Sequence, residues 1–123
     1  MKVIAISAAA LLSAGLVAGT AEAQTLEASA AQNVMSGATI TGTNSFGNPY
    51  SVTFAANGTV AGVAGLNDEF KDTGSWWMDE AKFCRQYSEW FEGKAACFGV
   101  STDGDVVRFH SANGAVVDQA RLK

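Results

Sequence analysis

The chain has 123 residues, with 8 basic and 12 acidic side chains and a formal net charge of −4. This length leaves room for one hydrophobic core and excludes two folded domains of ordinary size. The acidic balance disfavours DNA, RNA and anionic lipid as partners, because nucleic-acid binding depends on clustered lysine and arginine. With 13 glycines against one proline and 10% aromatic residues, the composition predicts a mostly β domain with tight turns.

Residues 1–23 have the pattern of a cleavable signal peptide. Lys2 supplies the positive start, residues 3–17 form an apolar run, and residues 21–23 (Ala-Glu-Ala) make a small-x-small cleavage site. The run is shorter than the roughly 20 apolar residues of a membrane span, and no second run follows it. We therefore expect a mature domain over residues 24–123, periplasmic or secreted and without a membrane span.

One helix is expected in the mature chain, over Thr25–Met35. Leu26, Ala30 and Val34 fall near one face, Thr25 is a plausible N-cap, and Gly37 is a plausible stop. A helix this short needs a surface to pack on, because isolated helices below about 12 residues are marginal.

From residue 38 onward the apolar residues alternate with polar ones, which predicts β-strands. The expected strands cover residues 38–43, 50–54, 59–65, 74–78, 83–90, 94–102, 105–111 and 115–122, with a charged loop over 66–72. Tight turns are predicted at Asn57-Gly58, Asp103-Gly104 and Asn113-Gly114. Successive hairpins without a crossover helix favour an antiparallel up-and-down barrel of about eight strands, with the helix over one end; a two-sheet sandwich is the alternative.

The only two cysteines, Cys84 and Cys97, fall on the two strands of one predicted hairpin. We expect them to form a cross-strand disulfide, which persists in an oxidising compartment. Two buried free thiols, or a redox or metal-binding pair, are the alternatives. A metal site has little support because there is no CxxC spacing and His110 is the only histidine, so we expect no cofactor.

No catalytic set stands out in the sequence. His110 has neither a serine elbow motif nor a matched acid near it, which favours a surface or hydrogen-bonded structural role. Asp103-Gly104-Asp105 resembles part of a calcium loop but lacks the glycine and closing glutamate of that motif. We therefore expect a non-enzymatic protein.

A short motif resembles one found in lipocalin-like barrels. Gly74-Ser75-Trp76 matches their G-x-W signature, and in such barrels an arginine often caps the tryptophan ring. Arg85 shares a strand face with Tyr87, so the resemblance implies a stacking contact between Arg85 and Trp76. Trp76, Arg85 and Tyr87 are accordingly the candidate core or ligand-binding face. Adjacent strand residues face opposite sides, so Trp76 is expected to be buried and Trp77 more exposed.

The order of the motifs is more specific than any one of them. The helix is followed by residues 37–43, 50–54 and 57–60, Gly74-Ser75-Trp76, Cys84-Arg85-Gln86-Tyr87, Cys97-Phe98 and Asp103-Gly104. This order resembles a family of small exported bacterial proteins that carry a domain of unknown function. The resemblance implies a barrel-like fold and the cysteine pair, and it brings no established activity. A fainter similarity to secreted protease inhibitors on small eight-stranded barrels implies a partner-binding role.

Trp90 and Phe91 form the candidate partner-binding site, because they meet at the turn between the cysteine-bearing strands. Two consecutive aromatic residues near a hairpin tip cannot easily both fold into one core, so at least one should reach solvent. We expect an exported monomeric binding or accessory protein, such as a protein inhibitor, for a protein or envelope component. The alternative is a small-ligand binder that uses the barrel interior.

Overall fold

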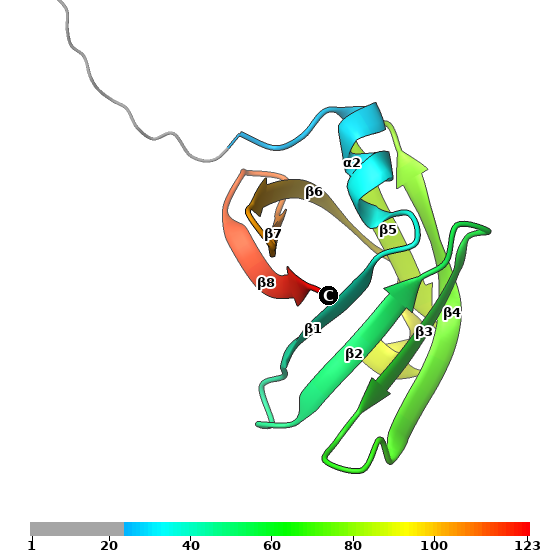
Figure 1. The fold of residues 1–123 in the computed structure, drawn as a ribbon. Coiled ribbons are helices and arrows are strands. Elements are labelled where there is room, and N and C mark those ends of the chain that lie inside the picture. Colours follow the sequence, from blue (N-terminus) through cyan, green and yellow to red (C-terminus); the bar gives the residue numbers. More distant parts are fainter. Residues whose placement is uncertain (1–23) are drawn as a thin grey trace, which may run out of the picture.

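The computed structural model describes residues 24–123; the predicted signal peptide lies outside the described residues. The described chain forms a closed barrel of eight strands, each paired antiparallel with its neighbour in sequence, and a short helix (Figure 1). The predicted up-and-down barrel is confirmed, and the two-sheet sandwich is wrong. Within this part of the chain, no helix is long and apolar enough to cross a membrane.

The strands follow a simple meander whose loops alternate between the two ends of the barrel. The elements are α2 (Ala28–Met35), β1 (Thr39–Thr43), β2 (Pro49–Phe54), β3 (Thr59–Ala64), β4 (Phe70–Asp79), β5 (Lys82–Tyr87), the 3-10 turn η3 (Trp90–Gly93), β6 (Ala96–Asp103), β7 (Val106–His110) and β8 (Val116–Leu122). Gly58, Gly104 and Gly114 all have positive φ, as the predicted tight turns require.

The helix begins later than the sequence pattern predicts. Glu27 is the N-cap, and its carboxylate accepts the amide of Ser29 at 3.1 Å. Thr25 is therefore not the cap. Instead the segment before the helix crosses β6, where the Leu26 amide donates to the carbonyl of Val100 at 2.7 Å.

Two strand boundaries also differ from the prediction. Residues 70–72, predicted as part of the charged loop over 66–72, belong to β4 and pair with residues 62–64 of β3. β5 ends at Tyr87, so Trp90 lies in η3 and not on a strand. Both differences arise from contacts between residues distant in the sequence. Pairing with β3 extends β4, and side-chain contacts described below hold the turn η3.

The end of the interior nearest α2 is filled by aromatic rings. The Phe83 ring lies 5.0 Å from Phe54, 5.9 Å from Trp76 and 5.6 Å from Phe109, measured between centroids. From α2, Ala31 and Met35 are fully buried in the same core. The expected position of the helix over one end of the barrel is confirmed (Figure 1).

The two adjacent tryptophans of β4 face opposite sides of the wall. Trp76 is 4% exposed, and its indole Nε1 donates to the Ala55 carbonyl at 2.7 Å. Trp77 is 38% exposed. The predicted orientation of this pair is confirmed.

Candidate functional site

A disulfide joins the two strands that carry the candidate partner-binding tip. Cys84 and Cys97 are directly opposite across β5 and β6, with their Cα atoms 4.0 Å apart. The predicted disulfide is confirmed, and among residues 24–123 no cysteine is free. The bond braces the base of the hairpin whose turn is η3.

The tip itself has an unusual backbone. Phe91, Glu92 and Gly93 follow one another in the left-handed region, with φ values of 57°, 61° and 69°. Each non-glycine residue in this region costs roughly 1–2 kcal/mol. Such a conformation persists only where surrounding contacts hold it in place.

Two side chains supply those contacts. The Oδ2 atom of Asp72 accepts the backbone amides of Glu89 and Trp90, each at 2.8 Å. On the other side of the tip, Gln86 Nε2 donates to the Gly93 carbonyl at 2.9 Å. Burial acts to raise the pKa of Asp72, but the backbone amides that it accepts outweigh burial and hold the pKa below its usual value. Asp72, predicted as a loop residue, is thus a strand residue that anchors the tip.

The two aromatic residues of the tip take different directions. Trp90 is half-buried and folds onto Gly62 of β3, where a Cβ atom would lie 2.5 Å from the Trp90 ring. Its ring centroid lies 5.3 Å from that of Tyr87. Phe91 is 61% exposed. The prediction that at least one of the pair reaches solvent is confirmed.

Arg85 points into the barrel beneath the tip. Its guanidinium carbon lies 4.0 Å from the Phe91 ring centroid, 5.4 Å from that of Phe98 and 5.5 Å from that of Tyr87. At these distances the rings attract the cation. Together Arg85, Tyr87, Trp90, Phe91 and Phe98 are called the tip site below.

The expected stacking of Arg85 on Trp76 is wrong. The two residues are cross-strand partners, but their side chains go to different ends of the barrel. The Trp76 ring packs on Phe54 and Phe83 in the core, whereas Arg85 extends toward the tip. Phe98 was missed by sequence analysis, although it faces the interior from the strand next to β5.

The tip site holds one cation, the half-buried Arg85, and one phenol, the buried Tyr87, and Tyr50 lies close enough for its charge to act on Tyr87. Burial lowers the pKa of Arg85, while the charges of Tyr87 and Asp118 act in the opposite direction. Burial raises the pKa of Tyr87 to about 12, and burial together with Asp118 raises that of Tyr50. At neutral pH both tyrosines therefore keep their protons and can donate hydrogen bonds.

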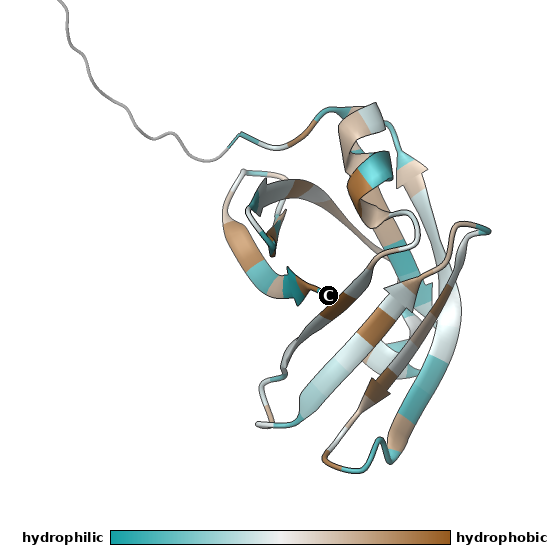
Figure 2. Ribbon diagram, in the orientation of Figure 1, coloured by the Kyte–Doolittle hydropathy of each residue, from teal (hydrophilic) through white to brown (hydrophobic). Residues whose placement is uncertain are grey.

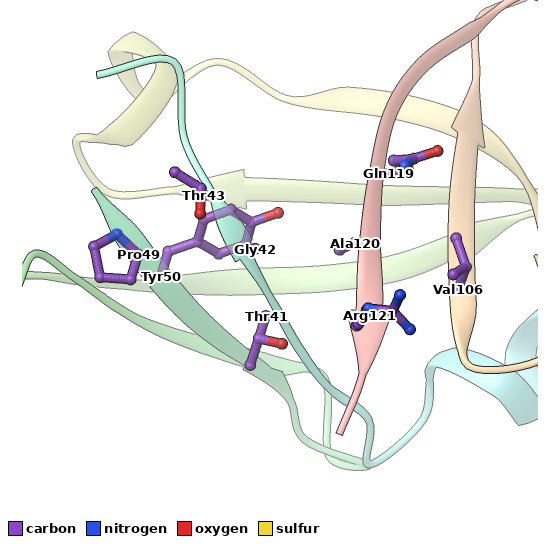
Figure 3. Close-up of a pocket in the computed structure, with 9 residues that line it drawn as sticks. All are labelled: Thr41, Gly42, Thr43, Pro49, Tyr50, Val106, Gln119, Ala120 and Arg121. Carbon is purple, nitrogen blue, oxygen red and sulfur yellow. The ribbon is translucent and has the colours of Figure 1, made fainter. Parts of the chain in front are cut away.

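A cavity of about 500 Å³ lies where the barrel closes. β1 and β8 pair at Ile40 with Leu122 and at Thr41 with Arg121, and the Lys123 amide donates to the Thr39 carbonyl at 2.9 Å. Gly42 and Thr43, at the other end of β1, have no ladder partner on β8. The cavity is lined by Thr41, Gly42, Thr43, Pro49, Tyr50, Val106, Gln119, Ala120 and Arg121 (Figure 3). Figure 3 shows the Tyr50 ring reaching past β1 with its hydroxyl directed toward β8.

His110 is buried on the outer side of β7, with 1% of its surface exposed. Its Nδ1 lies 2.9 Å from the Gly114 carbonyl, which can only accept, so Nδ1 donates. The other ring nitrogen, Nε2, lies 2.7 Å from the Ser101 hydroxyl, from which it accepts when the imidazole is neutral. Ser101 is 7% exposed. This geometry ties β6 to the β7–β8 turn, and the hydrogen bonding expected of His110 is present.

Exposed apolar side chains gather on the loops opposite α2. Figure 1 shows the β1–β2 and β3–β4 loops at the lower end, away from the helix, and Figure 2 shows hydrophobic residues among hydrophilic ones on the latter. Phe46 is 87% exposed, Leu66 83% and Phe70 51%. The meander places η3, with Phe91, at this same end. The tip therefore belongs to an end of the barrel that is unusually apolar at its surface.

Comparison with known proteins finds no family model, curated protein or solved structure that matches the chain.

Proposed function

We propose that this chain is an exported, non-enzymatic binding protein that holds a macromolecular partner through the tip site. The observation that carries the proposal is the exposed Phe91 ring on a tip held in one conformation. Aromatic residues, phenylalanine among them, are enriched at protein interfaces, and a preorganised loop loses little entropy on binding. The disulfide between Cys84 and Cys97 and the anchor at Asp72 supply that preorganisation.

The neighbouring loops extend the surface available to a partner. Phe46 and Leu66 are exposed on loops at the same end of the barrel as Phe91, and Phe70 is exposed where β4 begins. A polar rim around a few apolar anchors is the usual anatomy of a protein interface. The partner we propose is a protein or another envelope component, and an inhibitor of an exported enzyme is one form that this function takes.

The barrel interior supports this proposal over storage of a small ligand there. An eight-stranded barrel is wide enough either for its own side chains to fill or for one small ligand, and here the cavity at the β1–β8 junction is flanked by an interior that large side chains occupy. Phe83 packs against three other rings at the α2 end, and Trp90 and Tyr87 fold inward at the other end. Tyr50 occupies the space above Gly42, where a Cβ atom would lie 2.6 Å from the Tyr50 hydroxyl.

Periplasmic or secreted localisation belongs to the same proposal. A disulfide is characteristic of oxidising compartments, and the Cys84–Cys97 bond is the feature of the described chain that supports it.

Affinity capture from the native cell envelope tests the proposal. The bait is the natively exported protein with its disulfide intact, compared with Phe91→Ala and with Trp77→Ala as an aromatic control on the outer wall. We expect Phe91→Ala to reduce capture of a defined partner strongly, with the melting temperature nearly unchanged, and Trp77→Ala to leave capture intact.

Equal capture by Phe91→Ala and the unchanged protein would contradict the proposal. So would equal loss in both variants, because the two side chains lie on different faces of the barrel. The captured partner is then purified, and its affinity for each variant is measured directly.

A further inference from the structure

We propose that the tip site recognises a carboxylate of the partner, which Arg85 binds through the edge of its guanidinium while an apolar group beside it packs on Phe91. This inference rests on the proposed function, whose partner it characterises chemically. It concerns carboxylates in general, so an acidic side chain and a chain terminus are both possible sources.

Among the described residues, Arg85 has no partner for its charge. Within residues 24–123, the other two arginines pair with carboxylates: Arg108 with Asp103 at 3.7 Å and Arg121 with Asp105 at 2.8 Å. Arg85 makes neither an ion pair nor a side-chain hydrogen bond to the described chain, although it is more buried than Arg121. Its five N–H donors remain available to solvent or to a partner.

The contacts of Arg85 with aromatic rings leave the edge of its guanidinium free. A guanidinium that stacks on a ring uses its flat face and leaves the N–H groups on its edge free. Those edge donors match the two oxygens of a carboxylate in a bidentate pair. Phe91, Phe98 and Tyr87 supply ring contacts to Arg85, so the side chain is already oriented before a partner arrives.

A phenol and a carboxylate near Arg85 influence which ligand the site can hold. The Tyr87 ring lies 5.5 Å from the Arg85 guanidinium carbon, and its neutral phenol can donate a hydrogen bond to an anion. Asp118 is the carboxylate whose charge acts on both Arg85 and Tyr50. It is too far from Arg85 to form an ion pair, and a bound carboxylate would feel its repulsion.

The test uses small probes and nuclear magnetic resonance of the isotope-labelled, disulfide-intact exported protein, so it needs no identified partner. N-acetyl-phenylalanine carries a terminal carboxylate, N-acetyl-aspartyl-phenylalanine amide carries a side-chain carboxylate, and N-acetyl-phenylalanine amide is the uncharged control. The signals followed are the indole N–H of Trp90 and the Nε–H of Arg85.

We expect one or both acids to shift these signals in a saturable way and the amide to leave them unchanged. Comparison of the two acids shows which carboxylate source fits. Arg85→Gln should weaken binding by roughly tenfold or more, since a charge-assisted pair is lost. Arg85→Lys should weaken it less, because the charge remains. Asp118→Asn should strengthen binding, because the repelling charge is removed.

Equal binding of acid and amide, absence of binding by both acids, or unchanged affinity in Arg85→Gln would each overturn the inference. Melting curves of the variants confirm that they fold. The proposed function has a separate readout: if capture depends on Phe91 but is the same in Arg85→Gln, the tip binds its partner and the carboxylate inference fails. If the acids bind and capture does not depend on Phe91, the carboxylate site stands and the proposed function fails.

Discussion

The carboxylate of Asp72 and the backbone amide of Trp90 meet at 2.8 Å, although 18 residues separate them in the chain. Asp72 is on β4, and Trp90 opens the turn that follows β5. The bond thus fixes the tip to a strand that is not part of its own hairpin. Glu89 donates to the same oxygen, so a single side chain holds the start of η3.

Replacing Asp72 by alanine should loosen the tip without unfolding the barrel. We expect faster hydrogen exchange at the amides of Glu89 and Trp90, because both lose their acceptor, while amides of the core strands keep their protection. Asp79→Ala is the matched control, since Asp79 is an exposed carboxylate at the other end of β4. Exchange at Glu89 and Trp90 that is the same in all three proteins would show that Asp72 does not anchor the tip.

Acid should release the tip through the same residue. The pKa of Asp72 is lower in the folded protein than in the unfolded chain, so its stabilising contribution is fully present above the unfolded value of about 3.9 and is lost as pH falls through the folded value. We expect the Glu89 and Trp90 amide signals to shift in that acid range. In Asp72→Asn the transition should disappear; its persistence would assign it to another group.

The tryptophan pair of β4 predicts unequal losses of stability. Trp76→Ala should lower the free energy of unfolding by about 3–5 kcal/mol, the range for a large buried aromatic residue, and Trp77→Ala by much less. Denaturant unfolding of the two variants measures the difference. Equal losses would mean that the outer face around Trp77 is also covered, for example by a second protein molecule.

The disulfide predicts a difference between oxidised and reduced protein. Intact mass measured before and after alkylation should show no free thiol in natively exported protein. Reduction should lower the free energy of unfolding by about 3 kcal/mol, the value expected for a loop of this length in the chain-entropy model. Two alkylated cysteines in the unreduced protein would contradict the assignment.

The contact between His110 and Ser101 predicts a purely structural loss. Ser101→Ala leaves one buried ring nitrogen without its hydrogen bond and should cost about 1–3 kcal/mol. His110→Ala also opens a cavity and releases the Gly114 carbonyl, so its cost should be greater, about 2–5 kcal/mol. Chemical unfolding measures both values. Losses within 0.5 kcal/mol of zero, roughly the range for surface substitutions, would show that the pair is not needed to hold the turn.

The fold was predictable because local signals were consistent along the chain. Turn glycines such as Gly58 and Gly104 marked the hairpins, and strict alternation placed Trp76 inside and Trp77 outside. For the tip, the sequence predicted the position of the turn along the chain but not its backbone conformation. Its left-handed Phe91 is not a residue that favours this conformation, and its anchor at Asp72 is distant in sequence. The direction of Arg85 depends on side-chain packing, which strand parity does not determine.

The ladder between β1 and β8, called the seam here, is short, so the barrel wall is expected to open there. Two ladder pairs, Ile40 with Leu122 and Thr41 with Arg121, and one further bond from the Lys123 amide to the Thr39 carbonyl close it, whereas β7 and β8 pair over five positions. Opening there would turn a barrel without edges into a curved sheet with two unpaired borders. Such borders join readily between molecules. Unpaired strand borders are sites of aggregation, so the seam is the part of the wall whose opening would expose this barrel to pairing between molecules.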